Sequence, residues 1–433
     1  MLIYPGAAEL AAALKRPSAG NMEIDRKVRE IIQTVRSGGD AALRVFSEKF
    51  DGFAVDSVRI EASETDQAEG EVSSALKQAI RSAASNIEKF HLAGSSAMEV
   101  IETATGVRCW YRDTPIERVG LYIPGGTAPL FSSVLMLGIP ARLAGCREII
   151  MCTPPDRHGK INPLILYAAK VAGVNAIFRA GGAQAIAAMA YGTESIPAVC
   201  KIFGPGNRFV TRAKELVQLD GTAIDMPAGP SELMIIAGSS ANPAFVAADL
   251  LSQAEHGADS QVIMLTDTRK MMKAVEKEVH KQLSLLPRKC IAVQSLKNSS
   301  LILLESEEKC LEAANRYAPE HLIIAIADPM RAAERVTSAG SVFLGNYSSE
   351  STGDYMTGPN HTLPTGGFAK SFSGVTTGSF MKRIFFQEVT AEGVRTVGPD
   401  TVLMAQAEIL EGHAAAVSVR LKYLEVHSQQ QCQ

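Results

Sequence analysis

Five short stretches of the sequence each place a potential metal ligand or proton carrier beside turn-forming or helical residues. Four of the chain's eight histidines lie in these stretches. Imidazole and carboxylate groups are the usual ligands of zinc and the usual acid–base groups near neutral pH. If the stretches converge in space, they can hold a divalent metal and leave a His/Glu pair for proton transfer. They are Gln253-Ala254-Glu255-His256, Pro319-Glu320-His321, Gly353-Asp354-Tyr355, Asn360-His361 and Glu411-Gly412-His413.

Most of these stretches also have a plain structural interpretation when each is taken alone. Gln253 and His256 share one face of a helix expected to end at Gly257, but such a pair is more often a solvated helix end. Asp354 is expected beyond a strand, at the rim of a sheet, where most Gly-Asp pairs are simply turns. His413 lies in an apolar, helix-like stretch and is also consistent with a buried structural imidazole.

The Glu320-His321 pair is the most informative of the five. It stands between Pro319 and an expected apolar strand, Leu322–Ala327. A charged pair fits poorly at the start of a buried strand, and functional sites break local rules in this way. The pair is therefore the best candidate for proton transfer.

The composition describes an α/β protein with no electrostatic attraction to nucleic acid. Apolar residues make up 46% of the 433 residues, aromatic residues only 6%, and the net charge is −3. Small apolar residues let helices lie close on a sheet, and a weakly negative chain has no basic footprint. No apolar run reaches about 18 residues, so no membrane span is expected. The start of the chain also lacks the pattern of a signal peptide.

The cysteines favour a reducing compartment. Their number is odd, no Cys-x-x-Cys pair occurs, and most lie in apolar segments. We therefore expect reduced, buried thiols, no cysteine nucleophile and a cytoplasmic protein. The seven are Cys109, Cys146, Cys152, Cys200, Cys290, Cys310 and Cys432.

Short apolar segments alternate with helix-like segments, which predicts βαβ units and parallel sheets. The first set of expected strands is 119–123, 148–152, 176–179, 200–203 and 223–226, with helices at 130–144, 163–172, 184–191 and 208–217. The second set is 233–237, 262–266, 322–327 and 342–344, with helices at 243–255, 269–285 and 307–316. Further helices are expected at 22–50, 71–91 and 399–417.

This alternation predicts two α/β domains and a C-terminal appendage. Residues 15–121 and 232–374 are expected to form one domain, which carries most of the metal and catalytic site. Residues 122–231 form the inserted second domain, residues 375–433 the appendage, and residues 1–14 an N-terminal arm.

Three glycine loops each follow an expected strand and precede a helix. They are Pro124-Gly125-Gly126-Thr127, Gly181-Gly182-Ala183-Gln184 and Gly204-Pro205-Gly206-Asn207. No standard dinucleotide or phosphate fingerprint is present, and any one loop alone is most simply a tight turn. Together, at the carboxyl ends of parallel strands, they favour a cofactor or substrate site, because helix N-termini there suit a pyrophosphate.

Longer motifs that include these residues resemble those of the histidinol dehydrogenase family, nearly from end to end of the chain. One departure concerns Gly366-Gly367-Phe368, where aromatic residues around a glycine are expected more often, so the local loop shape is open. The matching motifs are Asp225-Met226-Pro227-Ala228-Gly229-Pro230-Ser231-Glu232, Ser252-Gln253-Ala254-Glu255-His256-Gly257, Tyr317-Ala318-Pro319-Glu320-His321, Gly353-Asp354-Tyr355, Pro359-Asn360-His361-Thr362-Leu363-Pro364-Thr365, Gly204-Pro205-Gly206-Asn207 and Tyr122-Ile123-Pro124-Gly125-Gly126.

The resemblance implies an intertwined homodimer with two Rossmann-like domains per chain. It implies oxidation of L-histidinol to L-histidine through L-histidinal with two NAD+ and one zinc ion, the last step of histidine biosynthesis. The implied zinc ligands are Gln253, His256, Asp354 and His413, the last from the partner subunit. His321 would be the general base and Glu320 would activate water. Ser231, His321, Glu408 and the zinc ligands would surround the substrate, and Tyr122, Gln184 and Asn207 would bind NAD.

Three other functions remain open from the sequence. A sister dehydrogenase of the same fold could act on another small amino alcohol or diol. A metal-dependent hydrolase could use the same metal groups and would need no nicotinamide. A non-catalytic binding protein of the same build would leave the Glu320-His321 pair unexplained.

Overall fold

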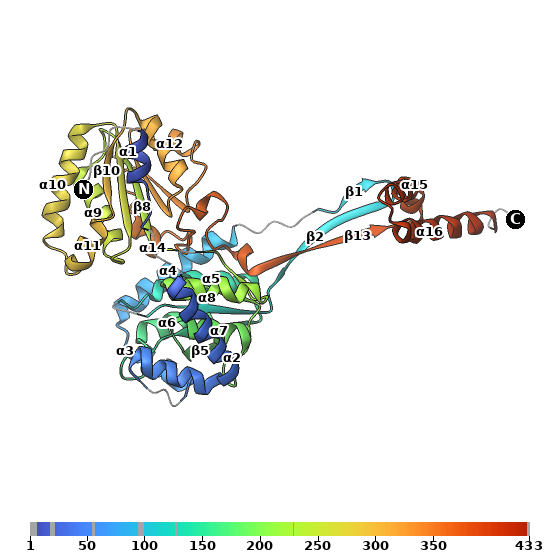
Figure 1. Cartoon of the computed structure of the whole chain (residues 1–433), viewed down its shortest axis with the longest axis horizontal. Helices are drawn as coiled ribbons and strands as arrows, with labels where there is room; N and C mark the ends of the chain where they lie inside the picture. Colours follow the sequence, from blue (N-terminus) through green and yellow to red (C-terminus); the bar gives the residue numbers. More distant parts are fainter. Residues whose placement is uncertain are drawn as a thin grey trace. The chain divides into compact units, whose positions relative to one another are not determined.

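The computed structural model describes residues 7–17, 22–53, 57–93, 99–125, 128–227 and 229–430. The chain forms two compact units, coloured along the sequence in Figure 1. One comprises Met1–Ala93 and Ile116–Phe380, and the other comprises Gly94–Pro115 and Met381–Gln433. The larger unit contains two five-stranded parallel sheets, as the alternation of strands and helices predicts.

The first sheet has the strand order β5-β4-β3-β6-β7. Its strands are nearly continuous apolar runs, as strands covered on both faces must be; Leu121 and Ile150, for example, are fully buried. The expected strands and helices of this region are confirmed to within a few residues. The strands are β3 (Arg118–Tyr122), β4 (Glu148–Thr153), β5 (Ala176–Arg179), β6 (Lys201–Phe203) and β7 (Ala223–Ile224), and the helices α5 (Phe131–Ala144), α6 (Pro163–Ala172), α7 (Gly182–Tyr191) and α8 (Arg208–Leu219).

Three amino-terminal helices pack on the helices of the first sheet. The long α2 (Met22–Asp51) contacts α7 and α8, α3 (Ala62–Glu71) contacts α6, and α4 (Ser74–Leu92) contacts α5. Alanines of α7 make this close approach possible, because small side chains let helix backbones come near each other. The last residue of α2, Asp51, lies beside a cavity of this region.

The second sheet, ordered β10-β9-β8-β11-β12, repeats the strand order of the first. In both, the first strand along the chain is central, the second and third lie on one side of it, and the fourth and fifth on the other. Its strands are β8 (Glu232–Ala237), β9 (Gln261–Thr266), β10 (Ser300–Leu303), β11 (His321–Ala325) and β12 (Ser341–Leu344). The accompanying helices are α1 (Ala7–Ala13), α9 (Pro243–Ala254), α10 (Arg269–Leu283), α11 (Lys289–Leu296), α12 (Glu307–Tyr317), α13 (Pro329–Ala333) and α14 (Glu350–Tyr355).

Two expected boundaries near the candidate site are corrected. Helix α9 ends at Ala254 rather than Gly257, so Gln253 is in its last turn and His256 follows it. The two residues still belong to one turn, because His256 N donates to Gln253 O at 3.2 Å. Strand β11 begins at His321, which pairs with Leu233 of β8 and Ser341 of β12, so the imidazole belongs to the strand itself.

The smaller unit contains an antiparallel sheet, which the sequence reading did not predict, and two helices. Strands β1 (Ile101–Ala104), β2 (Val107–Pro115) and β13 (Met381–Val389) form this sheet in the order β1-β2-β13. The helical character of the C-terminal part is confirmed, but the single helix expected over 399–417 is wrong. Helix α15 (Ala391–Ala407) ends and α16 (Glu411–Gln430) begins on either side of Ile409, whose φ of 62° breaks the helix.

Two further sequence expectations concern membranes and thiols. Among the described residues, no helix is long and apolar enough to cross a membrane. The expectation of buried thiols holds for Cys152 and Cys310, whereas Cys200 and Cys290 are exposed. Cys432 lies outside the described residues.

Two short 3-10 helices, Phe368–Lys370 and Thr377–Phe380, also belong to the larger unit.

Candidate active site and metal centre

The candidate site lies at the amino-terminal edge of the second sheet. Glu232 is the first residue of β8 and His321 the first residue of β11, and the two strands are neighbours. Helix α9 runs back toward this edge and delivers Gln253 and His256 just before β9 begins. Helix α14 adds two carboxylates. The fold thus brings together side chains that are more than a hundred positions apart in the sequence.

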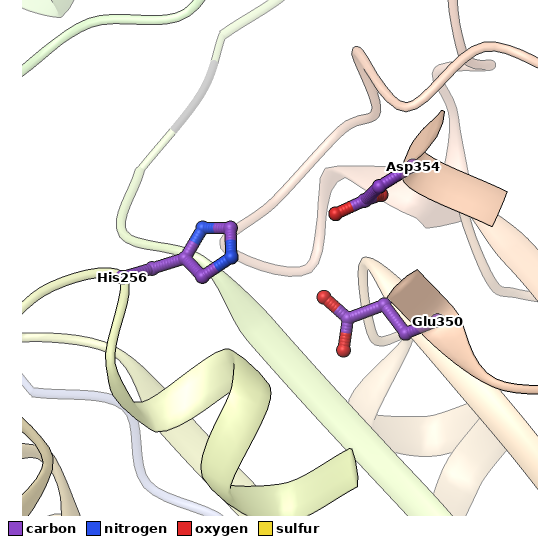
Figure 2. Close-up of side chains that lie close together, drawn as sticks. All are labelled: His256, Glu350 and Asp354. Atoms are coloured by element: carbon purple, nitrogen blue, oxygen red, sulfur yellow. The ribbon is translucent and has the colours of Figure 1, made fainter. Parts of the chain in front are cut away.

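Three side chains of this site face one another in a metal-binding arrangement. His256, Glu350 and Asp354 each offer a ligand atom, and these atoms lie within 4.8 Å of one another. Figure 2 shows the imidazole facing the two carboxylates, which project from α14. Glu350 is buried, Asp354 is half-buried and His256 is exposed. Nitrogen and carboxylate donors of this kind suit a zinc ion.

Gln253 lies directly beside this cluster, with only 1% of its surface exposed. With its nitrogen turned toward Glu350, the amide donates to Oε2 at 3.0 Å and its oxygen accepts from Glu232 N at 3.3 Å. In the opposite orientation the amide oxygen faces the carboxylate, and two acceptors face each other. That second arrangement would become favourable only with a cation between the two oxygens, so the Gln253 amide is able to serve either as a donor to Glu350 or as a metal ligand.

Glu350 is the residue of this cluster that the sequence reading missed. It lies four positions before Asp354 on α14, which puts both side chains on one face of the helix. The spacing of four residues between Glu350 and Asp354 was the signal in the sequence that could have identified Glu350. In every other respect, Ser349-Glu350-Ser351 looks like a solvent-exposed turn. Its burial, at 1% exposed, is what singles it out.

The His321 imidazole lies at the centre of the site and is neutral. Nδ1 lies 3.3 Å from Glu232 O and 3.8 Å from Glu350 Oε1, while Nε2 lies 3.8 Å from Asp354 Oδ1. Nε2 is buried and has no hydrogen-bond partner among the described residues. Burial lowers the pKa of His321 to about 3, partly opposed by the contact with the Glu232 backbone. A neutral imidazole with a free nitrogen is able to accept a proton.

The carboxylates around His321 are crowded in the absence of a cation. Burial raises the pKa of Glu320 well above its usual value, although its Oε2 accepts from Glu232 N at 2.9 Å. Burial, then the neighbouring Asp354, raises the pKa of Glu350. Burial raises the pKa of Asp354 to about 6, partly opposed by His256. A divalent cation in the cluster would favour the charged form of all three groups, so these residues fit a bound metal.

A cavity of about 1570 Å³ connects this edge of the second sheet to the carboxyl ends of the first sheet. Parts of all three glycine loops line it, including Gly125, Gly182 and Gly206; Gly126 and Thr127 lie outside the described residues. Tyr122, Gln184 and Asn207, the three residues matched to NAD, line it as well, together with Ser231 and His256. The expected rim of loops is therefore one wall of a single large cavity that ends at the metal cluster.

Two of these residues have fixed positions. The Tyr122 hydroxyl accepts from Gly182 N at 2.9 Å, and the ring is 3% exposed. Asn207 is the N-cap of α8, and its oxygen accepts from Phe209 N at 3.0 Å. Asn207 thus caps the start of α8, and the partial positive charge of a helix N-terminus favours an anionic ligand.

Known proteins of one family match the chain over nearly its whole length. The histidinol dehydrogenase family model matches residues 14–421. A histidinol dehydrogenase from Bacteroides thetaiotaomicron is 53% identical over 425 residues, 98% of this chain and 99% of that protein. One from Xylella fastidiosa is 50% identical over 413 residues, 95% and 96% of the two chains. The crystal structure of the enzyme from Elizabethkingia anophelis is 52% identical, covers 98% of this chain and 99% of that one, and has a TM-score of 0.96.

The chain belongs to the histidinol dehydrogenase family. Three of the four metal ligands expected from that resemblance, Gln253, His256 and Asp354, lie together in the larger unit. His413 and Glu408 lie in the smaller unit, where both are exposed. The structural interpretation of His413 as a buried core imidazole is therefore wrong.

The glycine pair that departs from the family's usual motif has a structural reason in this chain. Gly366 and Gly367 have φ values of 65° and 83°, which favour glycine. Gly366 N donates to Glu232 Oε1 at 3.1 Å, and Arg16 Nη2 donates to Glu232 Oε2 at 3.0 Å. The loop thus helps to fix the carboxylate of Glu232, whose backbone contacts both Glu320 and His321.

His361 is a further residue of the site; the sequence named it as a potential metal ligand or proton carrier but assigned it no specific role. It lines a second cavity, of about 470 Å³, together with His321 and Asp354. Its Nε2 is buried without a hydrogen-bond partner among the described residues, and burial lowers its pKa to about 4. A second neutral imidazole is therefore available beside the general-base candidate.

Proposed function

We propose that this chain oxidises L-histidinol to L-histidine through L-histidinal, with two NAD+ as hydride acceptors, as the last step of histidine biosynthesis. Membership of the histidinol dehydrogenase family supports this function. The observation that carries it in the structure is the placement of His321. Its unpartnered Nε2 lies 3.8 Å from a carboxylate of the metal cluster, and that cluster borders the cavity of the glycine loops.

Zinc would be held by Gln253, His256 and Asp354 of one chain and by His413 of a second copy, with Glu350 against the Gln253 amide. When bound, it supplies a positive charge that can bind an amino alcohol and favour loss of its hydroxyl proton. His321 accepts that proton at Nε2 while the carbon's hydrogen leaves as hydride to NAD+, so the alcohol becomes an aldehyde. Protonated His321 must then lose its proton before the second oxidation.

The aldehyde requires water before it can lose a second hydride. Glu320, adjacent to His321 and held by Glu232 N, orients that water, takes its proton when it adds to the carbonyl carbon and passes a proton to the carbonyl oxygen, which gives the hydrate. His321 then removes the hydroxyl proton of the hydrate as the second hydride leaves to a second NAD+. The product is the carboxylic acid, and its second oxygen comes from the water.

A cysteine nucleophile has no place in this scheme. Among the described residues, no cysteine lines either cavity. Burial raises the pKa of the Cys310 thiol to about 12 and raises that of Cys152 further, so both remain protonated. Water activated by Glu320 takes the role that a thiolate would otherwise have.

The substrate site is completed by a second copy of the chain. Glu408 and His413 are exposed on the smaller unit, which also exposes large apolar side chains that include Leu403, Met404 and Ile409. Apolar groups gathered on a small unit are typical of a subunit interface. We therefore place both residues, with Ser231 of the opposite chain, around the substrate of a homodimer in the cytoplasm. We keep the proposed division into residues 15–121 with 232–374, residues 122–231 and residues 375–433 with two changes. Residues 22–92 join the first sheet, on whose helices α2, α3 and α4 pack, and residues 94–115 join the C-terminal appendage.

Mixing two inactive variants tests the shared site. One chain carries His413→Ala and the other His321→Ala; in a mixed dimer one site has both lesions and the other has none. Random pairing should return roughly a quarter of the wild-type activity, because half of the dimers are mixed and each has one intact site. If the subunits demonstrably exchange and no activity returns, each site is built within one chain.

The assay of the purified protein with histidinol, NAD+ and zinc tests the function directly. We expect two NADH for each histidine formed. A sister dehydrogenase would reduce NAD+ with another amino alcohol or diol and not with histidinol. A hydrolase would form no NADH at all.

A further inference from the structure

We propose that Asp51 binds the ribose hydroxyls of the adenosine half of NAD+ and thereby selects NAD+ over its 2′-phosphorylated form. This inference rests on the proposed function only in taking NAD+ as the cofactor. Asp51 is the last residue of α2, outside the chain segment that builds the first sheet, and it lines the large cavity.

The first sheet fixes where the adenosine half should lie. Its strand order, β5-β4-β3-β6-β7, is that of a dinucleotide-binding fold in which β3 is the first strand and β4 the second. Ligands of such sheets bind at the carboxyl ends, near the central first strand. Tyr122 and Thr153 are the last residues of β3 and β4, and both line the same cavity as Asp51.

The carboxyl end of β4 has no acidic residue, although a dinucleotide-binding sheet usually carries one at the end of its second strand. In dinucleotide-binding folds a carboxylate near the end of the second strand accepts hydrogen bonds from the ribose. Here β4 ends at Thr153 and is followed by Pro154 and Pro155. The next acid, Asp156, uses its Oδ1 within its own loop, where it accepts from His158 N at 2.8 Å and Lys160 N at 2.9 Å.

Asp51 has an unused acceptor at this place. Its Oδ2 is buried and has no hydrogen-bond partner of regular geometry among the described residues, although the Ser47 hydroxyl, which is likewise unpartnered, lies near the carboxylate; Thr153 Oγ1 is also unpartnered. Burial raises the pKa of Asp51 to about 6, partly opposed by the Ser47 hydroxyl. Its charge also contributes, after burial, to the raised pKa of Tyr122, so the two groups are electrostatic neighbours. Buried acceptors without donors are unfavourable, and a ribose diol supplies two donors.

The chemistry of a carboxylate decides which cofactor is preferred. It accepts hydrogen bonds from a 2′-hydroxyl and a 3′-hydroxyl, but it repels a 2′-phosphate. The same negative charge that binds NAD+ therefore excludes its phosphorylated form. Pyrophosphate is an improbable ligand of Asp51 for the same reason, and the helix start at Asn207 suits it better.

Binding of ADP-ribose and of its 2′-phosphorylated form to the full-length zinc protein, measured by calorimetry, tests the role of Asp51 without turnover. Asp51→Asn should weaken ADP-ribose binding about tenfold to a hundredfold, since a charged hydrogen bond is lost. The preference over the 2′-phosphorylated form should fall by at least about tenfold. In turnover, the KM for NAD+ should rise while the KM for histidinol stays the same.

Two matched variants make the result specific. Glu30→Gln makes the same charge change on α2 at a residue that also lines the cavity, but Glu30 is exposed and paired with Arg26. It should leave both affinities as in the wild type. Asp156→Asn tests the rival acid after β4. Unchanged affinities in Asp51→Asn, or a lost preference in Asp156→Asn instead, would overturn the proposal. Wild-type protein that binds ADP-ribose yet makes no NADH from histidinol would contradict the proposed function alone.

Discussion

The two five-stranded sheets share one strand order but use opposite edges for function. In the first sheet, the loops at the carboxyl ends of β3, β5 and β6 line the large cavity. In the second sheet, the functional groups lie at the amino-terminal edge, where Glu232 and His321 begin β8 and β11. The rule that ligands gather at carboxyl ends therefore describes only the first sheet.

The difference follows from what each edge can offer. At the carboxyl edge, helices start, and the N-terminus of α8 at Asn207 presents N–H groups and a partial positive charge to an anion. At the amino-terminal edge, α9 ends at Ala254, just before His256, and its carboxyl terminus favours a cation. Helix α14, which begins at Glu350, supplies the carboxylates. One edge is thus suited to a dinucleotide and the other to a metal, although the folds are alike.

Removing the metal should have the largest effect and should act on one edge only. A chelator is expected to lower turnover more than about a thousandfold, because the zinc charge is lost, and added zinc should restore it. ADP-ribose binding, measured by calorimetry, should persist because the first sheet is untouched. Full activity in protein shown by elemental analysis to be metal-free would remove zinc from the mechanism.

Two histidines of the second sheet should separate proton transfer from metal binding. His321→Ala should lower kcat about a hundredfold to ten-thousandfold and keep zinc, since it removes a general base. His256→Ala, like His413→Ala, should instead lose zinc, as measured by elemental analysis after dialysis. The opposite pattern, with zinc lost from His321→Ala and kept by His256→Ala, would exchange the two roles.

Glu350 tests how far the metal site extends beyond the residues predicted from the sequence. Glu350→Gln should weaken zinc binding about tenfold to a hundredfold, because it removes a charge that faces His256 and Asp354. Competition with a chromogenic chelator measures that affinity. Glu255→Gln, one position before His256 and outside the cluster, is the matched control. Equal zinc affinity in both variants would place Glu350 outside the metal site.

The smallest effect concerns the other edge, where the Asp51 carboxylate is half-buried. Its pKa of about 6 in the folded chain exceeds the ordinary value of 3.8, so the folded state holds the proton more tightly. The contribution of Asp51 to the free energy of unfolding is therefore fully present below about pH 4, where the carboxyl group is protonated. It is lost as the pH rises through about 6 and the group ionises in the folded chain. Asp51→Asn should therefore match the wild type near pH 4 and be about 1 kcal/mol more stable near pH 8, after allowing for solvent screening. Urea unfolding at both pH values measures this; a difference that does not vary with pH would contradict it.

The secondary structure of the larger unit could be predicted because its signals are local. The apolar runs of β4 and β8 and the capping residue Asn162 before α6 are visible in a short window of sequence. The pairing of β2 with β13 has no such signal, since Trp110 lies opposite Phe386 and the two strands are joined only through the rest of the chain. Neither strand contains a buried residue, so no burial pattern marks them.

The sequence by itself identified the family, which the comparisons confirm, and it predicted the chemistry and the residues of the site, because motifs such as Glu320-His321 conflict with ordinary strand composition. Only the tertiary structure shows that Glu350 is buried within the metal cluster and that Asp51 lines the large cavity of the first sheet. Each is an ordinary acid on a helix, and what distinguishes it is burial among neighbours distant in sequence. Local patterns encode helices and strands, whereas desolvation depends on the whole fold, and it is desolvation that makes an acid reactive.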